Sequence, residues 1–147
     1  SAVMADTALG EAIAKLPGRK LIFTNGSHMH AENVVRQLGI DHVFDGIFDI
    51  VATAYEPKPR RRAYERFVEA SGIEPARAAM FEDIARNLEV PHALGMTTVW
   101  VRPDLPGSER HHQISHEGAD GGHVHHITEN LGDFLRRDCL APSAPAE

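Results

Sequence analysis

Cysteine, long apolar runs and basic charge are all scarce in this sequence, and each scarcity excludes a class of protein. Cys139 is the single cysteine, so a framework of intrachain disulfides is excluded and the chain fits a reducing compartment. No apolar run approaches the roughly 20 residues of a membrane-spanning helix. The 15 lysines and arginines are outnumbered by 21 acidic residues, and the net charge of −6 argues against nucleic acid or an anionic membrane as the main partner. We therefore expect a cytoplasmic protein that binds neither.

Length and hydrophobic content fit a globular protein. A chain of this length can form one domain that buries roughly 68–70% of its unfolded surface. Its hydrophobic content of 42% is ordinary for such a domain. We expect the domain to span residues 1–138, and residues 139–147 to form a disordered tail.

One stretch near the N-terminus has the pattern of a buried strand, a tight turn and a helix. The apolar run at 21–23 stops at Thr24 and Asn25, Gly26 and Ser27 follow, and a helical segment continues to Leu38. Asn25 or Ser27 would cap this helix. Such a turn presents a hydroxyl, backbone N–H groups and a helix N-terminus together, which suits a phosphate. The alternative is an ordinary strand-to-helix turn with a good cap.

Helical and strand patterns alternate along the whole chain. Alternation of this kind predicts an α/β fold, a three-layer sandwich with a mostly parallel sheet and helices on both faces. Ligands of such sheets bind at the carboxyl ends of the strands. The strands are expected at 21–23, 47–50, 78–81, 97–101 and 125–128, and the helices at 7–16, 31–38, 60–70, 84–94 and 131–137. Tyr64 should point inward from the 60–70 helix, which Ser71 and Gly72 end. Pro91 should kink the 84–94 helix or restart it.

Several polar residues at predicted strand or helix ends are candidates for chemistry. Lys58 lies between two prolines at a helix start, where a lysine can neutralise a phosphate, although a solvated surface lysine is the simpler interpretation. Glu82 and Asp83 follow a short apolar run, and paired carboxylates suit Mg²⁺, although Asp83 could equally cap a helix. Asn87 lies four residues beyond Asp83, so on a helix it would point back to the same place.

Histidines are concentrated between residues 111 and 126. His123, His125 and His126 have side chains that bind Zn²⁺ or Ni²⁺ in other proteins. Their spacing fits no recognised zinc motif, and only one cysteine is present. A polar, histidine-rich loop at the edge of the sheet is therefore the favoured interpretation.

Three motifs together resemble the haloacid dehalogenase (HAD) superfamily of phosphatases. The strings FTNG at 23–26, EPKP at 56–59 and FED at 81–83 with Asn87 look like motifs two, three and four of that superfamily. The fuller strings LIFTNGS, FDGIFDI and FEDIARNL are most similar to bacterial pyrimidine 5′-nucleotidases. The resemblance covers roughly residues 7–135 and implies a Rossmann-like HAD core.

The resemblance also implies a two-step phosphoryl transfer. In this superfamily an aspartate attacks the phosphate to form an aspartyl-phosphate, which water then hydrolyses. By motif match, Thr24 and the amides of Asn25 and Gly26 would hold the phosphoryl group, and Lys58 would balance the charge on nucleophile and phosphate. These are positioning and electrostatic roles, which dominate in phosphoryl transfer. The substrate would be a small phosphorylated metabolite, with a pyrimidine nucleoside monophosphate implied by the closest motifs.

The metal implied by the resemblance is Mg²⁺. By motif match, Asp83 would bind Mg²⁺ directly or through water. Glu82 and Asn87 would support it.

The motif that supplies the nucleophile in this superfamily is missing from the sequence. That motif is Asp-x-Asp followed by Thr or Val, and Asp-x-Asp occurs nowhere here; Asp45 and Asp49 are four residues apart and lie between motifs two and three. In the superfamily the first motif, the central strand and a helical cap precede the position where this chain begins. The chain thus resembles the C-terminal part of a HAD phosphatase: a fragment, a split subunit or a shortened paralogue. Without the central strand, the strand that ends before Thr24 and the strand that ends at Phe81 would each expose an unpaired edge. Such edges favour pairing with another chain or with the missing segment.

Two functions follow from these observations. The first is an Mg²⁺-dependent HAD phosphatase, or part of one, whose nucleophilic aspartate lies outside this chain, so that the chain alone is inactive. The second is a non-catalytic Rossmann-like module that binds a phosphate or a partner protein. An upstream reading frame encoding Asp-x-Asp-x-Thr would distinguish them.

Overall fold

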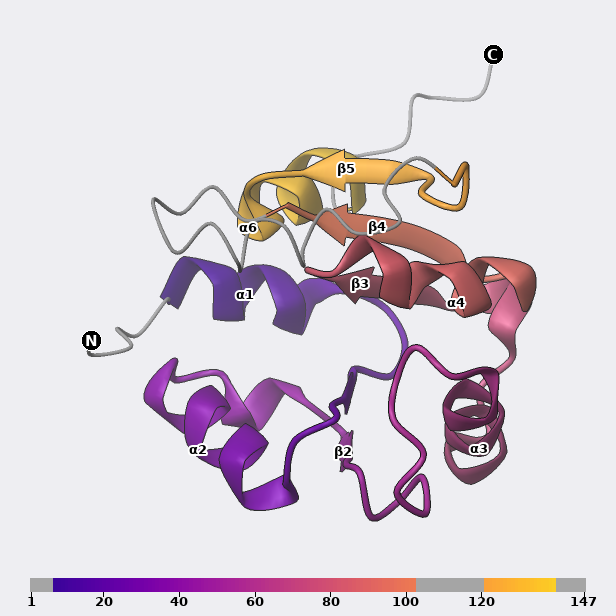
Figure 1. The fold of residues 1–147 in the computed structure, drawn as a ribbon. Helices are drawn as coiled ribbons and strands as arrows, with labels where there is room; N and C mark the ends of the chain where they lie inside the picture. Colours follow the sequence, from indigo (N-terminus) through magenta and orange to yellow (C-terminus); the bar gives the residue numbers. More distant parts are fainter. Residues whose placement is uncertain (1–6, 103–120, 140–147) are drawn as a thin grey trace, which may run out of the picture. The chain divides into compact units, whose positions relative to one another are not determined.

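The computed structural model describes residues 7–102 and 121–139, which fall into two compact units (Figure 1). The first unit contains residues 7–49 and 131–139, and the second contains residues 50–102 and 121–130. Each unit has its own sheet, and every strand pair in both sheets is parallel. No helix in the described ranges has the length and apolar character needed to cross a membrane.

The first unit is built around two short parallel strands. Leu21 of β1 pairs with Gly46 of β2, and the register continues to Phe23 and Phe48. A capping bond explains where the following helix begins, because Ser27 Oγ accepts a hydrogen bond from His30 N at 3.1 Å. The elements of this unit are α1 (Thr7–Lys15), β1 (Leu21–Phe23), α2 (His28–Gln37), η1 (Asp41–Val43), β2 (Gly46–Phe48), α6 (Leu131–Phe134) and the π-helical η4 (Leu135–Cys139).

The second unit has a three-stranded sheet in the order β3-β4-β5, and β4 lies in the middle (Figure 1). Its central strand is the most apolar and most buried, as expected for a strand covered on both faces. The 3₁₀ turn and the helix that follow β3 pack on the central strand β4. The elements are α3 (Arg61–Ser71), η2 (Pro75–Arg77), β3 (Ala79–Glu82), η3 (Ala85–Leu88), α4 (Glu89–Ala93), β4 (Thr97–Val101) and β5 (His126–Thr128).

The core of the second unit joins the sheet to the turn that follows β3. Trp100 packs with the fully buried Ala85 and Leu88, and Met80 and Val124 cover them. The indole Nε1 of Trp100 donates a hydrogen bond to the carbonyl of Asp83 at 3.0 Å. The core therefore fixes the backbone at the carboxyl end of β3, where two candidate residues lie.

The predicted α/β fold with parallel sheets is confirmed, and all five predicted strands are present with small changes in their ends. The predicted helix over 84–94, which Pro91 was expected to kink or restart, forms the 3₁₀ turn η3 and then α4. Pro91 lies in the first turn of α4, where its missing N–H is not needed, so it restarts the helix. The predicted helix over 131–137 changes after Phe134 to the π-helix η4.

Strands β1 and β3 belong to different sheets in the described ranges. That a strand outside this sequence would join them stays a prediction. Other expectations fall outside the described residues: the tail from 140 onward, and His111, His112 and His116 of the histidine-rich segment.

Candidate phosphate and metal site

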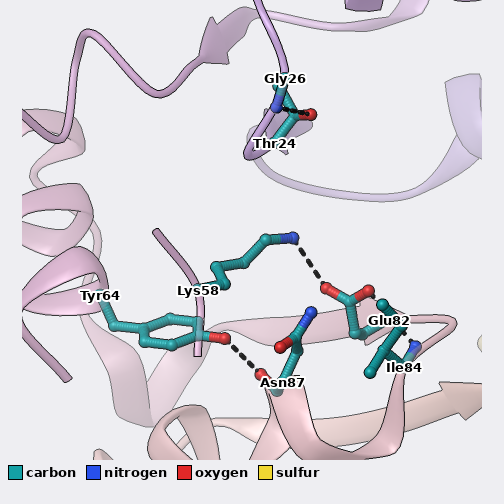
Figure 2. A network of polar contacts seen from close by, with 7 residues as sticks. All are labelled: Thr24, Gly26, Lys58, Tyr64, Glu82, Ile84 and Asn87. Atoms are coloured by element: carbon teal, nitrogen blue, oxygen red, sulfur yellow. Dashed lines mark hydrogen bonds and ion pairs between the residues drawn. The ribbon is translucent and has the colours of Figure 1, made fainter. Parts of the chain in front are cut away.

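A buried ion pair joins the lysine loop to the end of β3. Lys58 Nζ lies 2.8 Å from Glu82 Oε2, and the two side chains are only 9% and 8% exposed. Figure 2 shows the lysine reaching across to the carboxylate. Lys58 is held between Pro57 and Pro59, and the Lys58–Pro59 peptide bond is cis. The lysine is therefore a fixed, paired cation rather than a solvated surface residue.

The Glu82 carboxyl is held in surroundings that disfavour its charge. Burial raises the pKa of Glu82 above its ordinary value of 4.5, and this effect outweighs the opposing effect of the Lys58 ammonium. The neighbouring Asp83 raises the pKa of Glu82 further. Oε1 of Glu82 also accepts a long hydrogen bond from Ile84 N at 3.4 Å. Both oxygens thus have partners within the protein.

Asp83 and Asn87 flank this ion pair and differ sharply in exposure. Asp83 is exposed at the carboxyl end of β3, as expected for a ligand that meets solvent. Asn87 is 6% exposed, yet its side-chain amide makes no hydrogen bond within the described part of the chain. In Figure 2 this amide points toward the Lys58–Glu82 pair. This amide therefore remains able to bind a ligand beside the ion pair.

A tyrosine holds the backbone of Asn87 from the opposite side. Tyr64 of α3 is completely buried, and its hydroxyl donates a hydrogen bond to the Asn87 carbonyl at 2.6 Å (Figure 2). Helix α3 begins directly after the lysine loop. Lys58 bonds to Glu82 at the start of the turn after β3, and Tyr64 bonds to Asn87 near the end of that turn. The lysine loop and α3 therefore hold this turn at both ends.

The predicted phosphate turn lies in the first unit, at the end of β1. Thr24 N donates to the Phe48 carbonyl at 3.0 Å, which continues the pairing of β1 with β2. Thr24 Oγ1 accepts a hydrogen bond from Gly26 N at 3.0 Å, so the hydroxyl proton remains to be donated elsewhere (Figure 2). Ser27, rather than Asn25, provides the helix cap. That Thr24, Asn25 and Gly26 act together with Lys58 stays a prediction.

The two aspartates that lie between motifs two and three both have backbone partners. Asp45 Oδ2 accepts a hydrogen bond from Lys20 N at 2.7 Å, and Asp49 Oδ2 accepts one from His28 N at 3.2 Å. The second contact places a carboxylate at the N-terminus of α2, where the helix dipole favours an anion. These interactions give both aspartates a structural role.

The described histidines near the sheet edge also bond to backbone groups. His123 is buried, and its Nε2 lies 2.8 Å from the Ala85 carbonyl. Nδ1 of His125 accepts the N–H of Thr98 at 3.0 Å. Within the described ranges no group of three or more histidine, cysteine or acidic side chains is arranged to hold a metal. The His125 ring nitrogen holds β4 to the segment before β5, and the His123 ring nitrogen holds η3 to the same segment. These contacts were not anticipated from the sequence.

Mg²⁺ fits the residues around Asp83 on the evidence of the side chains themselves. The exposed Asp83 carboxylate and the Asn87 side-chain amide offer the hard oxygen ligands that Mg²⁺ prefers. Asp83 would bind the ion from solvent, and the Asn87 side-chain oxygen would support it. Glu82 would act mainly through Lys58, because both of its oxygens are already bonded.

The sequence interpretation named most of these residues but missed their pairings. It assigned Glu82 to a metal and Lys58 to a phosphate, and it did not expect the two to pair with each other. It placed Tyr64 in the core without a role for the hydroxyl. A buried tyrosine hydroxyl almost always needs an acceptor, and that rule was the available signal.

Comparison with known proteins places this chain in a family. A model of the haloacid dehalogenase-like hydrolases matches residues 3–95, which is more than half of the chain. A search of curated proteins found no match.

Solved structures of the same family share the fold. A HAD phosphatase from Thermococcus onnurineus has a TM-score of 0.66 and 18% identity, over 92% of this chain and 56% of its own. A HAD family hydrolase from Deinococcus radiodurans, solved with bound phosphate and sodium, has a TM-score of 0.63 and 19% identity, over 90% of this chain and 58% of its own. An L-2-haloacid dehalogenase from Xanthobacter autotrophicus, with chloropropionic acid covalently bound, has a TM-score of 0.63 and 18% identity, over 86% and 58%.

The chain spans about half the length of these structures. At such low identity the structural matches show the fold alone, whereas the match to the family model covers most of the candidate site. The chain belongs to the haloacid dehalogenase-like hydrolases.

Proposed function

We propose that this chain provides the lysine, metal and phosphate-binding part of an Mg²⁺-dependent phosphoric monoester hydrolase. The nucleophilic aspartate comes from a segment or chain outside this sequence, because Asp-x-Asp occurs nowhere in it. The substrate class is a pyrimidine nucleoside 5′-monophosphate. That choice is supported by the motif strings around Thr24, Phe44 and Phe81, and the bound phosphate in the Deinococcus structure supports a phosphorylated ligand.

The observation that carries the proposal is the arrangement around Lys58. A buried lysine–glutamate pair, an exposed aspartate and an asparagine side-chain amide that points toward the pair lie within one unit. The carboxylate and the amide offer oxygen ligands for a cation next to a fixed positive charge. The arrangement therefore suits a site that binds a cation and an anionic phosphate together.

Each residue has a defined task in this reaction. Mg²⁺ would offset the negative charge that develops on the phosphoryl oxygens. Lys58, fixed by Glu82, supplies a positive charge to the nucleophile and the phosphate, and Asp83 and Asn87 hold the cation. Thr24 keeps its hydroxyl proton for a phosphoryl oxygen, because its own oxygen is occupied by Gly26 N.

The test is phosphate release by the purified chain, alone and with an added N-terminal HAD segment that carries Asp-x-Asp-x-Thr. UMP and p-nitrophenyl phosphate serve as substrates, with Mg²⁺ or with EDTA, and L-2-chloropropionate tests for dehalogenation. We expect no activity from the chain alone, and Mg²⁺-dependent phosphate release once the segment is added. Asp83→Ala should abolish the restored activity, and the exposed Asp133→Ala should leave it unchanged.

Two results would contradict the proposal. Activity from the chain alone would place the nucleophile within it, and Asp49→Asn and Asp45→Asn would then identify the residue. Binding of phosphate without restored hydrolysis would favour the non-catalytic module, an alternative supported by the backbone contacts that already occupy Asp45 and Asp49.

A further inference from the structure

Tyr64 has an interaction that a packing role does not require. Its ring is completely buried on α3, and a phenylalanine would fill the same space. The hydroxyl reaches out of the helix to the Asn87 carbonyl at 2.6 Å, a short bond between two elements. Burying a hydroxyl is costly unless its acceptor is well placed, so the contact is a specific one.

The bond to Asn87 is the last of a series that ends at the ion pair. Asn87 N donates to the Ile84 carbonyl at 3.0 Å, and Ile84 N donates to Glu82 Oε1 at 3.4 Å. Glu82 in turn holds Lys58, which lies three positions before the first residue of α3. Tyr64 therefore closes a ring of contacts that returns to its own segment.

We propose that Tyr64 is a positioning residue that fixes the turn at Asn87 so that the Asn87 side-chain amide faces the Lys58–Glu82 pair. This inference rests on the proposed function, in which that amide supports the cation. The hydroxyl touches neither cation nor substrate and acts through Asn87.

The surroundings of Tyr64 keep the hydroxyl a donor. Burial raises the pKa of Tyr64 far above its ordinary value of 10.0, and the carboxylates of Glu82 and Glu89 raise it further. The phenol thus stays protonated at any working pH. The Asn87 carbonyl has a donor whether or not Glu82 is ionised.

The test compares Tyr64→Phe with Ser71→Ala in the 147-residue chain. Ser71 lies on the same helix, is also buried, and donates a hydroxyl hydrogen bond to the Phe67 carbonyl at 2.7 Å. Each variant therefore loses one buried hydrogen bond from a hydroxyl to a carbonyl, but only Tyr64→Phe removes the bond that holds the Asn87 backbone. The readouts are the NMR signals of the Asn87 side-chain amide, assigned with Asn87→Asp, and a titration with Mg²⁺ alone.

We expect Tyr64→Phe to shift and broaden the Asn87 amide signals and to weaken Mg²⁺ binding about tenfold, as loss of a supporting contact does in other metal sites. Ser71→Ala should leave both readouts as in the unmodified chain. Unchanged Asn87 signals in Tyr64→Phe, or equal changes in both variants, would overturn the proposal. If Mg²⁺ shifts no signal even in the unmodified chain, the proposed cation site fails, while the Asn87 amide still decides the role of Tyr64.

Discussion

Lys58 and Glu82 carry opposite charges in a place from which water is largely excluded. Neither charge is stable there alone, because desolvation of an unpaired ion costs more than most single contacts supply. Lys58→Met should therefore lower the free energy of unfolding by about 3 kcal/mol at pH 8, where Glu82 would be left without a partner. Urea unfolding measures the change.

The control is the double variant Lys58→Met/Glu82→Gln, which removes both charges. Its loss of stability should be smaller than the sum of the two single losses. Additive losses would mean that the two side chains do not interact in solution.

The raised pKa of Glu82 has a consequence for stability as a function of pH. The folded chain holds this proton more tightly than the unfolded chain, so stability from this group is fully present below pH 4.5 and is lost as the pH rises through the folded pKa. The unmodified chain should therefore lose stability relative to Glu82→Gln as the pH rises above 4.5. Urea unfolding of both proteins from pH 4 to pH 8 tests this.

The turn over residues 50–56 contains backbone conformations that suit glycine. Ala54 and Tyr55 have φ values of 53° and 65°, held by hydrogen bonds that include Tyr55 N to the Ile50 carbonyl at 2.8 Å. Side chains in this left-handed region are strained. Tyr55 is 70% exposed, so its ring adds little packing to offset the strain.

Tyr55→Gly should therefore raise the free energy of unfolding by about 1 kcal/mol, since glycine adopts this conformation without strain. Tyr55→Ala removes the same ring but retains the strain, and should change stability by less than about 0.5 kcal/mol. Thermal or urea unfolding compares the two. If Tyr55→Gly is no more stable than Tyr55→Ala, the turn is not strained in solution.

Features that depend on residues close in the sequence could be predicted, whereas features that depend on tertiary packing could not. The Ser27 cap and the end of α3 at Gly72 follow from neighbouring residues, and both were expected. The restart of the 84–94 helix was also expected, from Pro91, but the packing of Ala85 and Leu88 of η3 with Trp100 was not, because no local pattern reveals it. The same distinction explains why β5 was expected but the His125 contact with Thr98 was not.

The two units should open independently, because no sheet in the described ranges extends from one into the other. Val35→Ala in α2 removes a buried side chain of the first unit, and Val99→Ala in β4 does the same in the second. Each should cost about 1–2 kcal/mol. Hydrogen exchange should then speed up only in peptides of the unit that carries the change. Faster exchange in both units from either variant would mean that they unfold together.

For the molecule as a whole, sequence motifs predicted the family but not how the site is held together. The strings at Thr24, Lys58 and Asp83 carried the resemblance, and the match over residues 3–95 confirms the family. The pairing of Lys58 with Glu82 and of Tyr64 with Asn87 joins residues 24 and 23 positions apart. Such pairings depend on how α3 packs on the turn after β3, and a single sequence does not contain that information.

The single tryptophan of the chain lies against the backbone of a proposed magnesium ligand. Its indole N–H donates to the Asp83 carbonyl, and its ring is 3% exposed. A cation bound to the Asp83 carboxylate would shift the dipole of the Asp83 peptide carbonyl, which accepts the hydrogen bond from the indole. The chain therefore contains an intrinsic fluorophore at its candidate site, and its emission would report cation binding without any label.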